Sequence, residues 1–333
     1  MEDLISLFII AFSHITNHFL QPFVGLMDVH TIPDRILADP DLLRQIVFVD
    51  PVDSFIVQDA DNFQRMGSDM KLGFIGTGNM ASAIMGGIIK NQVIAADEII
   101  GADLFAPGRE RVKSQFGIHV TDSNKEVVEK SEVFILSVKP QFYADVIAEI
   151  KDLVREDQIV ITIAPGKTLA WLKEQFGKEV KIVRTMPNTP AMVGAGMTAA
   201  CPNENMKEDE IAYVKTLLES FGRVEIVPER LMDVVVSTSG SSPAYVFMLI
   251  EAMADAAVSG GMPRPQAYQF AAQAVMGSAK MVLDTGKHPG ELKDMVCSPA
   301  GTTIEAVRVL EERGFRSAVF EAMKVCEEMS KSM

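Results

Sequence analysis

Residues 71–81, Lys-Leu-Gly-Phe-Ile-Gly-Thr-Gly-Asn-Met-Ala, lead a short apolar run into a glycine turn and then into a helix-forming segment that continues to about Lys90. This order is typical of a strand, a phosphate-binding loop and a helix. Gly76 allows the tight turn, and Gly78 has no side chain to hold a pyrophosphate away from the backbone. The small Ala81 lets the helix pack closely on the strand, and the first helical turn offers unpaired N–H groups to phosphate oxygens.

A second predicted strand strengthens this interpretation, because a glycine pattern alone is common after strands. Residues 98–103, Glu-Ile-Ile-Gly-Ala-Asp, form a short apolar run that ends on an acid. Asp103 lies 22 residues beyond Ala81, where dinucleotide-binding folds place the group that binds the ribose. The two stretches together predict a nucleotide-binding site.

Strands and helices are predicted to alternate from Met70 to about Pro228. Further apolar runs predict strands at residues 118–120, 132–138, 158–164, 180–186 and 223–227. This order predicts an α/β fold with a Rossmann-like, doubly wound parallel sheet, and it places the ligand at the carboxyl ends of the strands. The segments expected at those ends are residues 76–81, Asp103, 138–140, 164–166 and 186–190.

Beyond Pro228 the sequence predicts an all-helical region. Helices are expected at about residues 242–257, 263–284, 289–296, 302–313 and 315–330. The helix that begins at Ser242 is apolar around most of its circumference and therefore needs partners on several sides. In a region of about a hundred residues we expect a second subunit to supply some of them, with a compact monomeric bundle as the alternative.

The loop that joins the helix ending near Val296 to the one starting near Thr302, residues 298–304, reads Ser-Pro-Ala-Gly-Thr-Thr-Ile. Its small residues let backbone N–H groups converge, and the following helix adds the positive end of its dipole. The loop is therefore a candidate pocket for an anion the size of a carboxylate. Alternatively, Ser298 and Thr302 serve only as cap and turn residues.

Composition narrows the possible functions of the 333-residue chain. Its net charge of −14, with no cluster of Lys and Arg, argues against a nucleic-acid or anionic membrane surface. The cysteines, Cys201, Cys297 and Cys326, lie far apart, and the five histidines are scattered. Neither a disulfide framework nor a metal site is expected, and a reducing, cytoplasmic location fits.

Residues 1–69 do not follow the pattern of the rest. The apolar run at residues 4–12 is too short to span a bilayer, and Glu2 and Asp3 precede it where a secretory signal carries positive charge. We expect residues 1–69 to be an upstream extension that has no part in catalysis and that results from a start codon assigned too far upstream. A short helix that binds a membrane surface or a partner is the alternative. The expected domains are thus residues 1–69, 70–228 and 229–333.

Six motifs in order resemble the pyrroline-5-carboxylate reductase family. They are residues 74–81, 138–141, 188–190, 239–245, 288–294 and 298–304. The family makes L-proline from the cyclic imine 1-pyrroline-5-carboxylate with NAD(P)H, which is the last step of proline biosynthesis. The resemblance covers the chain from Met70 to its end and implies a homodimer of interlocked C-terminal helices, often assembled into a larger ring.

The resemblance also implies roles for particular residues on the cofactor side. Those that would hold the pyrophosphate are Ile75, Gly76, Thr77, Gly78, Asn79 and Met80. Those that would line the adenosine side are Asn124, Ser137, Val138, Lys139 and Pro140. Ile163, Ala164 and Pro165 would lie near the nicotinamide. Met295 takes a position where relatives often have an asparagine that touches the cofactor.

On the substrate side, the resemblance implies that Thr302 and Thr303 bind the carboxylate and the ring nitrogen, within the loop that also holds Ser298 and Gly301. Glu229 matches a further substrate-site position. A protonated imine is already an electrophile, so no strong catalytic acid is needed, and a hydrogen bond between the Thr303 hydroxyl and the nitrogen suffices. We expect His288 to start a helix and Lys293 to be exposed or ion-paired.

Two observations point to different cofactors. Asp103 favours NADH, because it can bind a ribose 2′-OH and repels a 2′-phosphate. Arg109 and Arg111 are close enough in sequence to receive that phosphate, and the resemblance implies NADPH. We expect NADPH, with NADH as the alternative.

Two other classes of protein fit parts of the pattern. A β-hydroxyacid dehydrogenase-like enzyme would need a catalytic lysine on the helix that begins at Ser242, and residues 242–257 contain none. A nucleotide-sensing protein without catalysis would keep residues 76–81 but would not need the loop at residues 298–303.

Overall fold

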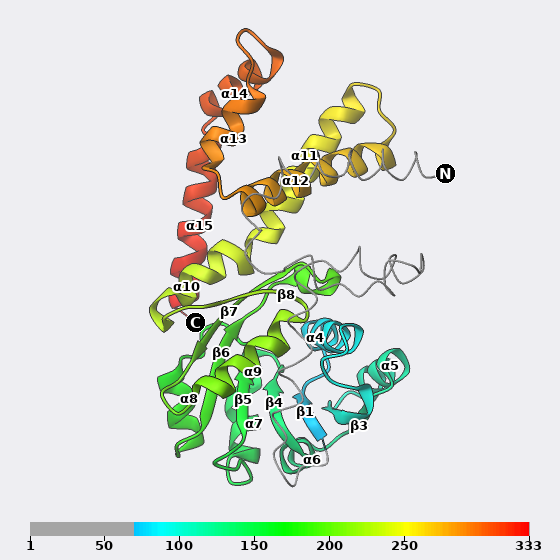
Figure 1. The fold of residues 1–333 in the computed structure, drawn as a ribbon, viewed down its shortest axis with the longest axis vertical. Helices are drawn as coiled ribbons and strands as arrows, with labels where there is room; N and C mark the ends of the chain where they lie inside the picture. Colours follow the sequence, from blue (N-terminus) through cyan, green and yellow to red (C-terminus); the bar gives the residue numbers. More distant parts are fainter. Residues whose placement is uncertain (1–69, 333) are drawn as a thin grey trace, which may run out of the picture. The chain divides into compact units, whose positions relative to one another are not determined.

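The computed structural model describes residues 70–332, which form one sheet flanked by helices and a run of C-terminal helices (Figure 1). Within these residues the sheet has eight strands in the order β3-β2-β1-β4-β5-β6-β7-β8. The strands are β1 (Met70–Ile75), β2 (Ile99–Ala102), β3 (His119–Thr121), β4 (Ser131–Leu136), β5 (Ile159–Thr162), β6 (Lys181–Met186), β7 (Gly196–Pro202) and β8 (Gly222–Ile226). Every neighbouring pair is parallel except β6 and β7.

Helices cover both faces of the sheet, which confirms the doubly wound architecture. The helices of this part are α4 (Asn79–Lys90), α5 (Ala106–Phe116), α6 (Asn124–Lys130), α7 (Tyr143–Ile150), α8 (Leu169–Phe176) and α9 (Glu208–Glu219). Side chains of α4, α5 and α9 form one apolar core with Val133 and Ile135 of β4. Those of α6, α7 and α8 form a second core with Phe134 and Leu136 of the same strand. The alternation follows because successive side chains of a strand point to opposite faces.

Strand β7 was not predicted, and it makes the sheet mixed rather than fully parallel. A 3₁₀ turn, η5 (Thr189–Val193), reverses the chain after β6, so that β7 lies between β6 and β8, antiparallel to β6 and parallel to β8. The strand has little β-branched character and consists mostly of small residues. Gly196 has no room for a side chain, because an added Cβ would lie 2.9 Å from the Phe221 carbonyl oxygen.

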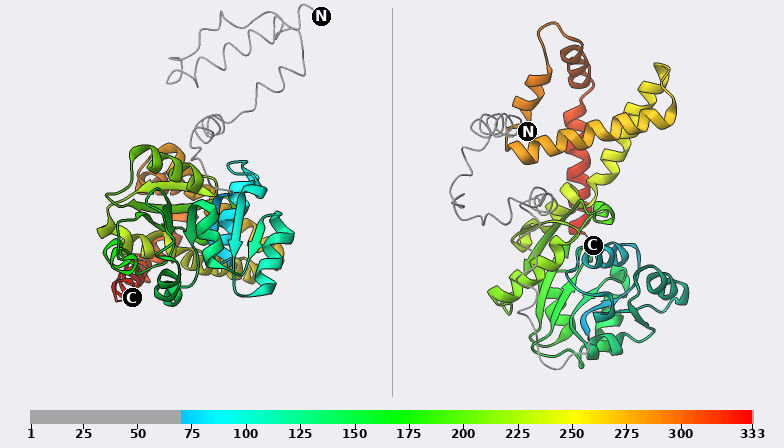
Figure 2. Two further views of the ribbon diagram at one scale, coloured as in Figure 1. Left: turned by 90° about the horizontal axis from the view of Figure 1, so that it is seen from below. Right: turned by 45° about the vertical axis from the view of Figure 1, so that its right-hand side comes forward.

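After β8 the described chain is helical, as predicted. The elements are η6 (Glu229–Leu231), α10 (Met232–Val235), the π-helical turn η7 (Val236–Gly240), α11 (Ser242–Ser259), α12 (Arg264–Thr285), α13 (Pro289–Val296), α14 (Thr302–Glu312) and α15 (Phe315–Lys331). Helices α11 and α12 pack against each other as a hairpin, and α15 returns to α10 and η7 (Figures 1 and 2). There Ser330 Oγ donates to Asp233 Oδ1 at 2.7 Å. The short elements α10 and η7 were not predicted.

Large apolar side chains of α11 to α15 lie at the surface of the single chain. Examples are Phe247, Met248, Phe270 and Phe320, each more than 60% exposed. Apolar surface of this extent is typical of an interface. The expectation that these helices need further packing partners therefore fits the structure.

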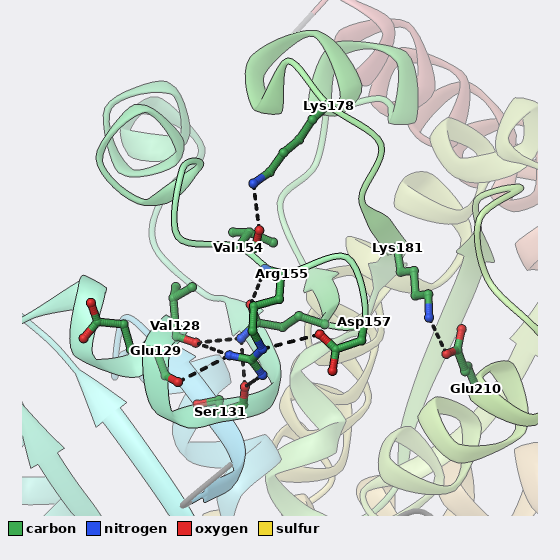
Figure 3. Close-up of polar contacts among 10 residues, drawn as sticks. Val128, Glu129, Ser131, Val154, Arg155, Asp157, Lys178, Lys181 and Glu210 are labelled. Carbon is green, nitrogen blue, oxygen red and sulfur yellow. Dashed lines mark hydrogen bonds and ion pairs between the residues drawn. The ribbon is translucent and has the colours of Figure 1, made fainter. Parts of the chain in front are cut away.

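At the amino ends of the strands, Arg155 joins α6 to the start of β4 (Figure 3). Its Nη1 donates to the carbonyls of Val128 and Glu129 at 3.4 and 3.3 Å, and its Nη2 donates to the Ser131 carbonyl at 3.0 Å. A cation at the carboxyl end of a helix is favourable because the last carbonyls have no partner within the helix. This edge is opposite the one at which the fold places ligands.

Within residues 70–332 no helix is long and apolar enough to cross a membrane. The same part of the chain holds no group of three or more His, Cys, Asp or Glu side chains placed to bind a metal ion. Cys201, Cys297 and Cys326 are free thiols. The hypothesis about residues 1–69 lies outside the described residues.

The pair between Lys181 of β6 and Glu210 of α9 supports a prediction. The two groups are 2.6 Å apart and their side chains are only 14% and 2% exposed (Figure 3). Lys181→Met should lower the free energy of unfolding by about 3 kcal/mol, because the carboxylate stays buried without its lysine. Urea denaturation measures this, with Lys173→Met in the exposed pair with Glu179 as control. Equal effects of the two variants would contradict the prediction.

Candidate active site

The glycine turn after β1 ties three strands together. Gly76 has a φ of +98°, and its N–H donates to the Ala102 carbonyl at 2.8 Å. Ser137, after β4, donates from its N–H to the Ile75 carbonyl at 2.8 Å and from Oγ to the Gly76 carbonyl at 2.7 Å. A Cβ at Gly76 would lie 2.8 Å from the Ser137 carbonyl carbon. Both the left-handed backbone and the lack of space therefore require glycine here.

The next glycine faces open space. A Cβ added at Gly78 would meet nothing within 4 Å, so backbone there is open to a ligand. Gly78 is also the N-cap of α4, whose first turn has neither a side-chain cap nor an acidic residue. The first N–H groups of a helix have no partner within it and carry partial positive charge. This end of α4 fits a pyrophosphate.

A cavity of about 530 Å³ opens at the carboxyl ends of β1, β2 and β4. Its lining contains these residues from the predicted cofactor set: Gly76, Gly78, Asp103, Asn124, Ser137, Val138 and Lys139. The other members of that set do not line it: Ile75, Thr77, Asn79, Met80, Ala81, Pro140, Ile163, Ala164, Pro165 and Met295. The cavity, the glycine turn and the end of α4 together fit a dinucleotide.

Sequence reasoning missed several residues that line the same cavity. They are Ala102, Leu104, Phe105, Phe142, Asp145, Val146 and Glu149. Asp145 and Glu149 are four residues apart on α7 and so share one helical face, which the sequence pattern could have revealed. Glu149 Oε2 accepts a hydrogen bond from Asn124 Nδ2 at 2.8 Å. Leu104 and Phe105 follow β2 and are largely exposed, as expected of a surface that stacks on a base.

Asp103 lies at the predicted place, but its carboxylate is already bound within the protein. Its Oδ2 accepts hydrogen bonds from the N–H and the Oγ1 of Thr77, each at 2.9 Å. Its Oδ1 accepts one from the Phe105 N–H at 3.0 Å. Thr77 is only 1% exposed. Asp103 therefore fixes the phosphate loop in addition to lining the cavity.

The carboxyl ends of β4 and β5 are joined by a buried tyrosine. The Tyr143 hydroxyl donates to the Leu136 carbonyl at 2.5 Å and accepts from the Ile163 N–H at 3.3 Å. Burial raises the pKa of Tyr143 far above its ordinary value. The hydroxyl therefore stays protonated and positions the backbone at Ile163, where the predicted nicotinamide side begins.

The loop at residues 298–303 joins α13 to α14. Ala300 has a φ of +55°, and the Gly301 N–H donates to the Ser298 carbonyl at 3.0 Å. Gly301 is the N-cap of α14, and Thr302 and Thr303 form the first turn of that helix. No residue of this loop lines the nucleotide cavity, and α14 is well separated from β1 in Figure 1 and in the right-hand view of Figure 2. A single chain does not bring the two predicted halves of the site together.

Glu229 forms hydrogen bonds with residues of the sheet domain. Its Oε1 accepts hydrogen bonds from Arg184 Nη1 at 2.9 Å and from the N–H of Leu169, the first residue of α8, at 2.7 Å. Arg184 is 4% exposed. A carboxylate at a helix start and beside a buried arginine is stabilising, so Glu229 anchors the start of the helical region. Its substrate role stays a prediction.

The other ionisable candidates near α13 have structural roles, as expected. His288 is the N-cap of α13, and its Nδ1 accepts from the Gly290 N–H at 3.0 Å. Lys293 forms an exposed ion pair with Asp294 at 2.5 Å.

The fold and the cavity define a Rossmann-type dinucleotide-binding protein. A family model described as pyrroline-5-carboxylate reductase dimerisation matches residues 229–333, and one described as coenzyme F420-dependent NADP oxidoreductase matches residues 71–166. The pyrroline-5-carboxylate reductase of Escherichia coli (strain K12) is 52% identical over 268 residues, which are 80% of this chain and 98% of that protein. The chain belongs to the pyrroline-5-carboxylate reductase family.

Other relatives and solved structures support the same family assignment. The pyrroline-5-carboxylate reductase of Methanosarcina acetivorans is 41% identical over 265 residues, 80% of this chain and 98% of its own. The structure of that enzyme from Coxiella burnetii superposes with a TM-score of 0.74 at 32% identity and covers 80% of this chain and 98% of its own. The structure of the Plasmodium falciparum enzyme, solved with NADP bound, superposes with a TM-score of 0.73 at 31% identity. The match covers 80% of this chain and 99% of that one.

The two glycines of the turn should respond differently to substitution. Gly78→Val should weaken nucleotide binding about tenfold or more and leave folding intact, because its side chain would enter open space where the pyrophosphate is expected. Gly76→Ala should instead lower the melting temperature, because its Cβ clashes with backbone. Calorimetric titration and thermal denaturation separate the two effects. Unchanged nucleotide affinity in Gly78→Val would contradict the assignment.

Proposed function

We propose that this chain reduces the C=N bond of 1-pyrroline-5-carboxylate to give L-proline, the last step of proline biosynthesis, and does so in the cytoplasm. When bound, a reduced nicotinamide dinucleotide supplies the hydride. One observation carries the proposal: the chain aligns with 98% of the Escherichia coli reductase at 52% identity. The open glycine turn and the adjoining cavity support it independently.

On the cofactor side, we assign the residues by what each can hold. Gly78 and the first turn of α4 present N–H groups to the pyrophosphate, and Gly76 forms the tight turn that precedes them. Ser137 to Pro140 and Asn124 border the adenosine half, with Asp103 at the ribose. Ile163 to Pro165 position the nicotinamide through the backbone at the end of β5. A donor held about 3–3.5 Å from the imine carbon removes most of the entropic barrier to transfer.

On the substrate side, the start of α14 receives the carboxylate. The N–H groups of Thr302 and Thr303 and the helix dipole favour an anion there. The Thr303 hydroxyl oxygen accepts a hydrogen bond from the protonated ring nitrogen, which orients an imine that needs no further acid. Ser298 and Gly301 give the loop its shape, and Glu229 supports the site through Arg184.

The two halves come together, in this proposal, through a second subunit. The nucleotide cavity of one chain lacks any residue from the C-terminal helices, and those helices expose large apolar side chains. The match of residues 229–333 to a dimerisation family supports a homodimer built on them. The partner's α14 loop then faces the nucleotide cavity, and dimers assemble further into a ring.

An activity assay tests the proposed reaction. Oxidation of reduced nicotinamide dinucleotide should follow addition of 1-pyrroline-5-carboxylate and not of a panel of hydroxy acids. A chain that begins at Met70 should keep full activity, because we place the whole site in residues 70–228 and 229–333. Turnover of a hydroxy acid alone would overturn the reaction, and loss of activity on removal of residues 1–69 would overturn the domain assignment.

Thr303 offers a sharper test of the substrate half. Thr303→Val keeps the shape of the side chain but removes the hydroxyl, and should lower turnover about a hundredfold or more. Thr303→Ser keeps the hydroxyl and should recover most of the activity. Thermal denaturation controls for folding. Near-normal turnover in Thr303→Val would contradict the proposed hydrogen bond between Thr303 and the ring nitrogen.

A further inference from the structure

Most of the charged side chains that line the nucleotide cavity are negative. Asp103, Asp145 and Glu149 line the cavity, and Lys139 is the one cation among its lining residues in the described chain. A phosphate monoester carries about −1.5 to −2 charges at neutral pH. A 2′-phosphate would therefore enter a space in which carboxylates outnumber the cation.

Asp103 cannot readily turn away from such a phosphate. Its two carboxylate oxygens accept three hydrogen bonds, from the N–H and hydroxyl of the buried Thr77 and from the Phe105 N–H. These donors belong to the phosphate loop and to the backbone after β2. A side chain held in this way is pre-organised, so its charge stays at the end of β2. A carboxylate oxygen also has lone pairs left to accept a hydrogen bond from a ribose hydroxyl.

The two arginines that could have received a 2′-phosphate are hydrogen-bonded to carbonyls of the protein. Arg109 Nη1 donates to the Asp103 carbonyl at 2.5 Å. Arg111 Nη2 donates to the Thr77 carbonyl at 2.6 Å and to Ser82 Oγ at 3.3 Å. Neither side chain lines the nucleotide cavity. Arg111 instead borders a separate groove between α4, α5 and η5.

We propose that Asp103 is a specificity-determining residue that makes this chain prefer NADH to NADPH. The inference rests on the proposed use of a nicotinamide dinucleotide and departs from the NADPH that the sequence resemblance implied. The fixed carboxylate accepts the ribose 2′-OH of NADH and repels the 2′-phosphate of NADPH. The arginines stabilise the loop that carries it.

Direct binding to the wild-type protein tests the inference without any turnover. Calorimetric titration with NADH and NADPH, and with ADP-ribose and its 2′-phosphate, should show about tenfold or tighter binding of the ligands that lack the phosphate. The ratio should fall as salt is added, because salt screens the repulsion. Equal or tighter binding of NADPH overturns the inference.

Matched variants locate the effect. Asp103→Ser and Asp103→Asn should move the affinity ratio toward NADPH about tenfold, whereas Asp145→Asn, which removes the same charge from the same cavity, should move it about threefold or less. Equal shifts would overturn the role of Asp103. If both Asp103 variants fail to fold, the wild-type ratio still decides the preference.

Failure of this inference differs from failure of the proposed reaction. If NADH and NADPH bind but neither supports reduction of 1-pyrroline-5-carboxylate, the proposed reaction is wrong and the binding ratio still tests Asp103. If reduction proceeds and NADPH binds as tightly as NADH, the reaction stands and the role of Asp103 is wrong.

Discussion

The close approach of β1 and β4 at Gly76 is the constraint on which the rest of the site depends. The backbone of Ser137, which hydrogen-bonds to the turn, leaves no space for a side chain at Gly76. Because the turn is that tight, α4 begins directly after Gly78 and directs its first N–H groups toward the cavity. Asp103 then fixes the loop from the neighbouring strand through Thr77. The geometry for a dinucleotide thus comes from backbone contacts that are present before any ligand binds.

In the proposed site, the C-terminal helices contribute in a different way, through association with a second chain. Its helices expose apolar residues such as Phe247 and Phe320 that burial against another copy would remove from water. The loop that leads into α14 presents backbone donors at a helix start, yet none of its residues lines the nucleotide cavity. Association of two chains would solve both problems at once, since it covers the apolar faces and brings an anion pocket to each nucleotide cavity. Stability and catalysis would then share one interface.

Much of the fold could be predicted because apolar runs separated by glycine and proline mark its elements. Strand β7 could not, because Gly196–Pro202 consists mainly of small residues and pairs antiparallel through a turn without a hairpin pattern. The position of Asp103 at the end of β2 was predicted. Its hydrogen bonds with Thr77 could not be predicted, because they depend on the directions of the two side chains. The pairing of Glu229 with Arg184 joins residues 45 positions apart, which no local pattern reveals.

The central claim is that one subunit's nucleotide cavity works with its partner's α14 loop. Co-expression of the Gly78→Val and Thr303→Val chains tests it, because a mixed dimer then contains one site with both defects and one intact site. Since half of randomly assembled dimers are mixed, turnover should recover to about a quarter of the wild-type value. If each site lies within one chain, every site stays defective. Turnover no higher than that of the separate variants would then contradict the account.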